Sequence, residues 1–344
     1  MADRPVVLRY APERVLVVKP SSLGDVVHSL PFLHALKSCM PDARIDWVIA
    51  RGLEGLLEGH PMIKDLIVID KDRWRRISRA AETLGELREL SDRLKAGGYD
   101  LVIDLQGLLR SGLMTKATAA PVRIGFAEAR EGSRFFYTHK VTGGRDIHAV
   151  DRYLKIAAAL GCPPGKVAFP FPEPARGSDV VRDIRDRLKD YIVLVPGARW
   201  DTKIWPAELF GRLASVLPLR SVVIGGNADR QRAEEIVRVS GGRAVSLAGQ
   251  TTIPELVELI RSSRCAITND SGPMHIAAAL DIPVVALFGP TSPVKTGPYG
   301  SRHLVLKSER ACAPCFKKKC DDIRCMRDIS VEMVLAGTKE LLQE

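Results

Sequence analysis

The sequence predicts an α/β protein with two similar units, each a parallel sheet covered by helices. Three observations carry this prediction. Short apolar strand segments alternate with helical segments in the first half, a proline-rich stretch interrupts the pattern, and the same alternation then restarts. The stretch ends at residues 169–174 (FPFPEP), where proline continues neither a helix nor a central strand. We therefore expect domains at residues 1–170 and 178–344, joined by a linker.

The individual elements follow from the local apolar patterns. In the first unit, strands are expected at Val15–Val18, Ile45–Ile49, Leu66–Ile69 and Leu101–Asp104, and helices near residues 26–38, 52–59, 80–97 and 148–160. In the second, strands are expected at Tyr191–Val195, Ser221–Ile224, Cys265–Thr268 and Pro283–Phe288, and helices near residues 180–189, 206–216, 228–239, 253–261 and 273–280. A last helix near residues 331–342 either completes the second unit or packs back on the first.

Composition indicates a soluble globular protein. Of the 344 residues, 46% are hydrophobic and 27% are charged, and no apolar run approaches the ~20 residues of a membrane span. The first residues lack the apolar core of a signal peptide. We therefore expect a cytosolic location.

The positive charge is spread over the whole chain. The net charge is +10, and the two halves share it equally, with 26 basic and 21 acidic residues up to residue 175 and 25 and 20 after it. Such a field favours anionic partners, among them nucleotides, nucleic acid, phosphorylated lipids and an acidic membrane face. The densest basic segment is residues 71–79 (KDRWRRISR), for which a solvated surface is the simplest interpretation on composition alone.

The loop at residues 21–25 (SSLGD) presents one carboxylate between the first strand and the first helix. Open α/β sheets bind ligands at the carboxyl ends of their strands, so Asp25 is a candidate catalytic acid or base. The alternative from this segment alone is that Asp25 only caps the helix.

Four loops of the second unit follow strands in the same way. Residues 270–275 (DSGPMH) open a helix whose free N–H groups and positive end suit a diphosphate, although an ordinary cap by Asp270 or Ser271 is the alternative. Lys203, in the loop at residues 196–206 (PGARWDTKIWP), offers a compact positive charge for the same diphosphate. The other two loops are residues 225–229 (GGNAD), where Asp229 suits ribose hydroxyls or a plain turn, and residues 289–293 (GPTSP). No P-loop, nucleophile elbow or zincin motif is present.

The seven cysteines fall into two groups. Cys39, Cys162 and Cys265 lie in apolar contexts and are expected to be reduced core thiols. The other four, Cys312, Cys315, Cys320 and Cys325, are spaced C-x2-C-x4-C-x4-C. A structural zinc site and a reduced or oxidised surface loop both fit this spacing, with the loop favoured. A catalytic metal is not expected, because Lys317–Lys319 lie inside the segment.

Taken together, these segments resemble the family-nine glycosyltransferases, the bacterial lipopolysaccharide heptosyltransferases. The resemblance covers nearly the whole chain, and its strength is the order in which the motifs occur. The matching segments are residues 21–28 (SSLGDVVH), 99–108 (YDLVIDLQGL) with Ser111, Arg130-Glu131 before 135–137 (FFY), 148–152 (HAVDR), Lys203 with Trp205-Pro206, residues 270–275 and residues 289–291.

The resemblance implies a GT-B fold, in which two Rossmann-like domains face a central cleft. The N-terminal domain would bind the acceptor and the C-terminal domain the nucleotide sugar. It further implies inverting transfer of heptose from ADP-heptose to the Kdo/heptose inner core, with no metal and no cofactor. The acceptor would be of lipid A-Kdo type, no nucleic acid would be bound, and the enzyme would be cytoplasmic and peripheral on the inner face of the inner membrane. The oligomeric state stays open.

The resemblance also implies roles for individual residues. The catalytic residues would be Asp25 as general base and Lys203 as the charge that stabilises departing ADP. Donor contacts would come from Thr202, Asp229, Asp270, Ser271, Gly272, His275, Gly289 and Thr291. Acceptor contacts would come from Ser22, Gly24, Arg73, Arg75, Arg76, Gln106 and Arg130.

Three alternatives stay open beside this interpretation. The N-terminal half resembles the first heptosyltransferase of the pathway, while the cysteine segment resembles the second, so the acceptor is either Kdo or a first heptose. The same fold and mechanism would also serve another nucleotide sugar or glycan acceptor. A basic nucleotide- or RNA-binding protein is the non-enzyme alternative, and the aromatic content of 6%, with no RNA-recognition pattern, argues against it.

Overall fold

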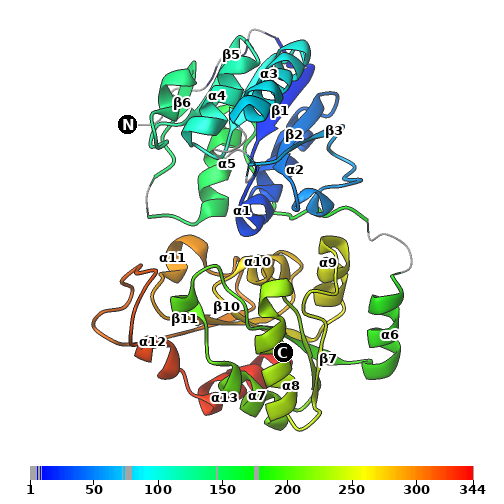
Figure 1. The fold of residues 1–344 in the computed structure, drawn as a ribbon. Helices are drawn as coiled ribbons and strands as arrows, with labels where there is room; N and C mark the ends of the chain where they lie inside the picture. The colour runs from blue at the N-terminus through cyan, green and yellow to red at the C-terminus, as the bar shows by residue number, and fades with distance from the viewer. Residues whose placement is uncertain are drawn as a thin grey trace. The chain divides into compact units, whose positions relative to one another are not determined.

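The computed structural model describes residues 6, 8, 10–71, 73, 80–144, 146–173 and 178–343, with side chains in the helix that starts at Ala80 described from residue 83. The chain divides into two compact units, Met1–Glu173 and Pro174–Glu344 (Figure 1). Each unit contains a six-stranded sheet whose described strand pairs are all parallel. An α/β fold with two parallel sheets is therefore confirmed.

The sheet of the first unit has the order β3-β2-β1-β4-β5-β6. Its strands are β1 (Arg14–Val18), β2 (Arg44–Ala50), β3 (Asp65–Ile69), β4 (Leu101–Asp104), β5 (Val122–Phe126) and β6 (His139–Val141). The chain first builds outward from β1 to β3 and then returns to the other side of β1. The switch point therefore lies between β1 and β4, where Val18 pairs with Asp104 at the carboxyl ends.

Helices of the first unit form two groups. One group is α1 (Leu23–His28), α2 (Leu30–Cys39) and α5 (Ala149–Ala159), in which α5 packs on both others. The other is α3 (Ala80–Ala96) and α4 (Leu109–Ala117), which pack on each other and, through Leu94 and Met114, share a core with alternate β1 residues Leu16 and Val18. Strand β1 is thus buried on both faces, which explains its unbroken apolar sequence.

The second unit repeats this plan with the order β12-β11-β10-β7-β8-β9. Its strands are β7 (Tyr191–Val195), β8 (Arg220–Val223), β9 (Ala244–Ser246), β10 (Cys265–Asn269), β11 (Val284–Phe288) and β12 (His303–Lys307). Its helices are α6 (Asp179–Leu188), α7 (Ala207–Val216), α8 (Arg230–Val239), α9 (Ile253–Arg261), α10 (Gly272–Ala279), α11 (Pro293–Thr296), α12 (Arg324–Arg327) and α13 (Val331–Gln343). The last helix, α13, packs on α7 and β12. The switch point here lies between β7 and β10.

Two predicted helices of the first unit are wrong in detail. The helix expected over residues 26–38 is divided at Ser29, because Pro31 stands in the first turn of α2 and has no N–H to continue the ladder of α1. The helix expected over residues 52–59 is only a 3₁₀ turn, Glu54–Leu56, since Gly52 and Gly59 adopt positive φ values of 84° and 71°.

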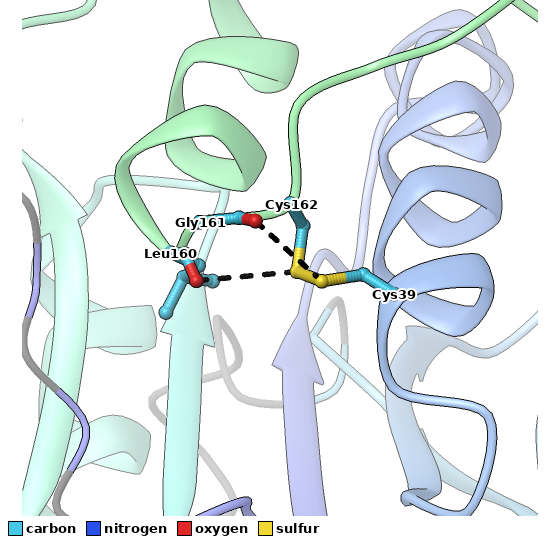
Figure 2. Close-up of a disulfide and its surroundings, with 4 residues drawn as sticks. All are labelled: Cys39, Leu160, Gly161 and Cys162. Carbon is cyan, nitrogen blue, oxygen red and sulfur yellow. Dashed lines mark hydrogen bonds between the residues drawn. A yellow bond between two sulfur atoms is a disulfide. The ribbon is translucent and has the colours of Figure 1, made fainter.

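The interpretation of Cys39 and Cys162 as reduced core thiols is also wrong. Figure 2 shows them joined in a disulfide, with Cα atoms 5.4 Å apart. Cys39 ends α2 and Cys162 follows α5, and the packing of α2 on α5 brings them together. The bond closes a separation of 123 residues within the first unit.

Candidate functional site

The two switch points gather most of the residues singled out in the sequence. In the first unit, the loop after β1 leads to Asp25 and the loop after β4 carries Gln106. In the second, the loop after β7 carries Lys203 and the loop after β10 carries Asp270. Switch points of open sheets are the usual ligand sites of doubly wound folds.

Asp25 lies in the first turn of α1, and its two oxygens have different surroundings. Oδ2 accepts hydrogen bonds from the Ser22 N–H at 3.0 Å and from Ser22 Oγ at 2.6 Å. Oδ1 lies 3.5 Å from the Tyr153 hydroxyl and 3.8 Å from the Lys19 ammonium group. The side chain is 38% exposed. One oxygen therefore caps the helix, while the carboxylate still reaches solvent, so a cap and a chemical role are compatible.

Lys19 is the buried cation beside this carboxylate. Its side chain is only 3% exposed, and its Nζ lies 5.3 Å from the centre of the Tyr153 ring. Burial by itself lowers the pKa of Lys19, but the charges of Asp25 and Asp104 and the contact with Tyr153 raise it above its usual value. Lys19 therefore stays charged and holds a fixed positive field at Asp25.

The loop after β4 is organised by the buried carboxylate of Asp104. Its oxygens accept from the N–H groups of Gln106 (2.8 Å) and Gly107 (3.0 Å), from Ser111 Oγ (2.8 Å) and from the Tyr137 hydroxyl (2.6 Å). Burial raises the pKa of Asp104, against these hydrogen bonds, which favour the carboxylate. The arrangement fixes the turn that carries Gln106.

Gln106 connects this turn to the loop after β1, since its Oε1 accepts from the Ser21 N–H at 3.3 Å. Ser22 is the exposed N-cap of α1 and Gly24 is buried inside the same helix. Arg130 belongs to the loop after β5 and lies next to the β4 loop, because its N–H donates to the Gly107 carbonyl at 2.9 Å. Arg130 is exposed. The structure thus brings Ser22, Gly24, Gln106 and Arg130 to the region of Asp25.

Arg73 lies in a separate charged pocket of about 420 Å³. Its guanidinium pairs with Glu86 at 2.8 Å, and Arg51, which also lines the pocket, pairs with Asp70 at 3.4 Å. Arg75 and Arg76, predicted to contact the acceptor together with Arg73, lie outside the described residues.

The second unit brings Lys203, Asp270 and Thr291 into contact. Lys203 Nζ lies 2.6 Å from Asp270 Oδ2, and the Thr291 hydroxyl donates to the same oxygen at 2.7 Å. Lys203 and Asp270 are 15% and 7% exposed. Asn269 ties the two loops together, because it accepts from the Trp205 N–H at 3.1 Å and donates to the Pro196 carbonyl at 2.8 Å. Lys203 is therefore held beside the amino end of α10.

The amino end of α10 is close to the form predicted from the sequence. Ser271 is its N-cap, Gly272 its first residue, and Pro273 occupies the first turn, where its missing N–H costs nothing. The Ser271 hydroxyl is buried and has no hydrogen-bond partner within the described part of the chain. His275 is 7% exposed on the same helix.

Asp229, Thr202 and Gly289 contact other residues of the second unit. Asp229 accepts from the Gly226 N–H at 3.0 Å and pairs with Arg232 at 2.7 Å. The Thr202 hydroxyl donates to the Lys317 carbonyl at 2.8 Å. A Cβ on Gly289 would lie 2.5 Å from the sulfur of Met326, so protein atoms occupy the space beside this glycine.

Comparison with known proteins shows which family has this sequence. The model of Glycosyltransferase family 9 (heptosyltransferase) matches residues 87–324. Lipopolysaccharide heptosyltransferase 1 of Pseudomonas aeruginosa is 34% identical, over 95% of this chain and 94% of its own length. The chain belongs to glycosyltransferase family 9. The enzyme of the same name from Escherichia coli K12 is 28% identical over 86% of this chain and 94% of its own length.

Solved structures of the family share the whole fold. A glycosyl transferase family 9 protein from Veillonella parvula aligns with a TM-score of 0.80 at 26% identity, over 96% of this chain and 97% of that one. The E. coli heptosyltransferase WaaC with ADP-2-deoxy-2-fluoro heptose aligns with a TM-score of 0.76 at 25% identity, over 95% and 99%. The two Rossmann-like units therefore form the GT-B fold of lipopolysaccharide heptosyltransferases, and the chain is a glycosyltransferase.

The four late cysteines of this family-nine chain differ in exposure, and Cys312, Cys315 and Cys320 lie near enough to act electrostatically on Cys325. Cys312 and Cys320 are exposed, Cys315 is half-buried and Cys325 is buried, and burial raises the pKa of the Cys325 thiol. Among the described residues, no three His, Cys, Asp or Glu side chains are placed to hold a metal ion.

Several residues at these sites were missed in the sequence. Lys19 was signalled by its position directly after an apolar strand. Tyr153 was signalled by its position directly after the family motif HAVDR, as the fifth residue of α5. In the second unit, the ammonium groups of Lys203 and Lys318 both lie over the Trp200 ring, 4.6 and 5.3 Å from its centre. Lys318 belongs to the lysine run that was interpreted only as an argument against a metal.

No helix in the described ranges combines the length and apolarity needed to cross a bilayer.

Proposed function

We propose that this glycosyltransferase moves heptose from ADP-heptose to the Kdo residue of a lipid A-Kdo acceptor, the first heptose addition of the inner core. The relative with 34% identity is a lipopolysaccharide heptosyltransferase 1, which supports Kdo over a first heptose as acceptor. The observation that carries the chemistry is that Asp25 keeps one carboxylate oxygen outside its capping bonds, beside a buried ammonium group.

In the proposed step, Asp25 takes the proton of the acceptor hydroxyl. The hydroxyl oxygen attacks the anomeric carbon from the face opposite ADP, the bond between that carbon and the diphosphate oxygen breaks, and the configuration inverts. One carboxylate is sufficient, because a single displacement needs no covalent intermediate. Lys19 holds the positive charge that favours an ionised base before the step.

We assign to the second unit the groups that stabilise the negative charge developing on ADP. Lys203, fixed by Asp270, and the N–H groups at the start of α10 are prealigned donors for a diphosphate. Asp270 lowers the freedom of the Lys203 side chain, and Thr291 holds Asp270 in turn. We assign charge neutralisation to these groups and propose that transfer proceeds without a metal ion.

The remaining assignments follow the same division. We propose that Thr202, Asp229, Ser271, Gly272, His275 and Gly289 belong to the nucleotide-sugar site, and that Ser22, Gly24, Gln106, Arg130 and the arginines Arg73, Arg75 and Arg76 belong to the acceptor site. The arginines suit the carboxylates of Kdo and the phosphates of lipid A. Such an acceptor would place the enzyme peripherally at the cytoplasmic face of the inner membrane.

A transfer assay with two acceptors tests this function. Purified enzyme, ADP-heptose and EDTA are incubated with either Kdo-lipid A or its mono-heptosylated form, and products are weighed by mass spectrometry. We expect one heptose on Kdo-lipid A and none on the second acceptor. Addition only to the mono-heptosylated form would reassign the enzyme to the second step. No addition to either, with ADP still bound, would contradict the donor or the acceptor class.

A further inference from the structure

Exposed apolar side chains are concentrated on one part of the first unit. Of the ten large apolar side chains that stand exposed among the described residues, five lie on three packed elements, α3, α4 and the 3₁₀ turn Ser133–Phe136. They are Leu84, Leu87, Leu109, Leu113 and Phe135, with exposed fractions from 39% to 74%. Figure 1 shows α3 and α4 side by side. We call these three elements the α3–α4 surface.

An apolar groove runs between α3 and α4. Its volume is about 410 Å³, and its apolar lining comes from Leu87, Leu90, Leu94, Leu113, Met114 and Ala117. Leu94 and Met114 are almost fully buried and form its floor, while Leu87 and Leu113 stand open at its edge. The opposite side of α3 contributes Glu86 and Glu89 to the charged pocket of Arg73. Helix α3 thus separates an apolar groove from a charged one.

The exposed charges nearest this groove on α4 and the 3₁₀ turn are positive. Arg110, Lys116 and Arg134 are all exposed, and neither α4 nor the 3₁₀ turn contains an acidic residue. The acidic groups beside them are Glu89 and Asp92 on α3 and Glu131, which accepts from the Leu109 N–H at 3.1 Å. Arg134 lies 5.1 Å from the centre of the Phe135 ring, and Lys116 lies 5.7 Å from that of Phe136. Apolar side chains interleaved with long cationic ones are typical of surfaces that insert into the headgroup region of a membrane.

We propose that the α3–α4 surface docks on an anionic lipid bilayer. Leu84, Leu109, Leu113 and Phe135 would enter the acyl region, while the three cations contact headgroup phosphates. The inference rests on the proposed function, whose acceptor is itself a membrane lipid. The guanidinium of Arg110 supports it, because it donates to the carbonyl of Lys71, the first residue of the basic segment assigned to that acceptor. Docking here would place Lys71 close to the membrane surface.

Charge favours a bilayer over a second copy of the chain as the occupant. A symmetric dimer through this face would set the same surface against itself, so the cations of α4 and the 3₁₀ turn would face an identical set of cations. Like charges brought together in an interface oppose association, whereas anionic headgroups complement them.

Vesicle flotation of the full chain tests the proposal with a matched pair of variants. Leu113→Gln changes a side chain 50% exposed in the groove, and Val216→Gln changes one 51% exposed on α7 of the second unit. We expect the wild type to float with phosphatidylglycerol–phosphatidylethanolamine vesicles and to float less with phosphatidylcholine alone. Leu113→Gln should weaken vesicle binding by about tenfold, as burial of a half-exposed leucine allows, and Val216→Gln should float like the wild type.

A second readout does not depend on the groove variant. Phe135→Trp places a reporter at a side chain 74% exposed, and brominated lipids should quench its fluorescence but not that of a Val294→Trp control. Transfer to a water-soluble Kdo acceptor, measured on the same variants, separates the two claims. If the wild type transfers no heptose to the water-soluble acceptor, the proposed function is contradicted. The flotation results test only the proposal that the α3–α4 surface binds membranes.

Three results would overturn the membrane proposal. They are a wild type that does not bind anionic vesicles, a Leu113→Gln variant that floats as well as the wild type, and a wild-type dimer in sedimentation that Leu113→Gln dissociates. The last result would make this face an interface between copies.

Discussion

Asp104 shows how a single buried residue positions a functional loop. Its carboxylate gathers two backbone N–H groups and two hydroxyls at the end of β4, and that turn carries Gln106 and receives Arg130. The residue itself has no exposed surface and so cannot contact a ligand. In the sequence it was the last residue of a predicted strand and part of a segment shared with the family, and no role was assigned to it, because its partner Tyr137 lies 33 residues away along the chain.

The Tyr137 hydroxyl is the partner of Asp104 that can be removed most cleanly. Tyr137→Phe leaves a buried carboxylate one donor short, and we expect it to lower the unfolding free energy by about 2 kcal/mol. Urea unfolding measures the loss. Tyr10→Phe makes the same chemical change on a side chain 86% exposed and should leave stability unchanged. Equal effects of the two substitutions would show that the Asp104 contact contributes nothing.

His60 makes the stability of the first unit depend on pH. Its Nδ1 accepts from the Met62 N–H at 3.1 Å, so its Nε2 donates to the Pro170 carbonyl at 3.0 Å, and burial lowers the pKa of this imidazole below 6.5. Since the unfolded chain binds this proton at higher pH than the folded one, the stabilisation is present above about pH 6.5 and is lost as pH falls toward the folded pKa.

His60→Gln checks the sign of this term. The stability difference between wild type and variant, from urea unfolding, should be largest near pH 7.5 and shrink toward pH 5.5. A difference that stays constant across this range would mean that the folded and unfolded pKa values of His60 are equal.

At the scale of elements, glycines in α3 and α4 have opposite surroundings. A Cβ on Gly85 of α3 would meet nothing within 4 Å, whereas one on Gly112 of α4 would lie 2.6 Å from the Phe136 ring and 3.0 Å from the Ser133 Cα. Gly85→Ala should therefore raise the unfolding free energy by about 0.5–1 kcal/mol through helix propensity.

Gly112→Ala should lower the unfolding free energy by about 1–3 kcal/mol, because the Ser133 backbone cannot move aside as a flexible side chain could. Thermal unfolding of both variants measures the pair. Stabilisation by both substitutions would show that α4 and the turn Ser133–Phe136 are not closely packed.

The sequence predicted the central strands because their environment is uniform. Strands such as β1, β4, β7 and β10 are buried on both faces, so most of their residues are apolar. The missed strands are β5, β6, β9 and β12, which lie toward sheet edges, contain partly exposed residues and are as short as three residues. Helix α4 was missed as well, since its exposed Leu109 and Leu113 break the amphipathic pattern.

Site residues could be predicted where a single loop after a strand carries them. Contacts between residues that are brought together only by the fold could not be predicted. Asp25, Lys203 and Asp270 each follow a predicted strand, and parallel strands place such loops at one edge. The pairing of Lys19 with Asp25 and the bond between Cys39 and Cys162 required knowledge of which helices pack together. No spacing in the sequence encodes a contact across 123 residues.

For the whole molecule, each unit presents one chemically distinct switch point. The first offers a carboxylate with a buried cation behind it, and the second a lysine at the amino end of a helix. A base for an acceptor and a cationic cradle for a diphosphate are the two parts that direct glycosyl displacement needs. The central claim is that Asp25 supplies the base.

The most direct test is Asp25→Asn, assayed for heptose transfer to Kdo-lipid A and for ADP binding by calorimetry. Asparagine keeps an oxygen to accept from Ser22, so the cap of α1 survives, but it cannot take a proton at neutral pH. We predict that kcat falls by about 10²–10⁴-fold while the Kd for ADP is unchanged, and that Asp42→Asn at an exposed turn behaves as wild type. Turnover by Asp25→Asn at the wild-type rate would contradict the account.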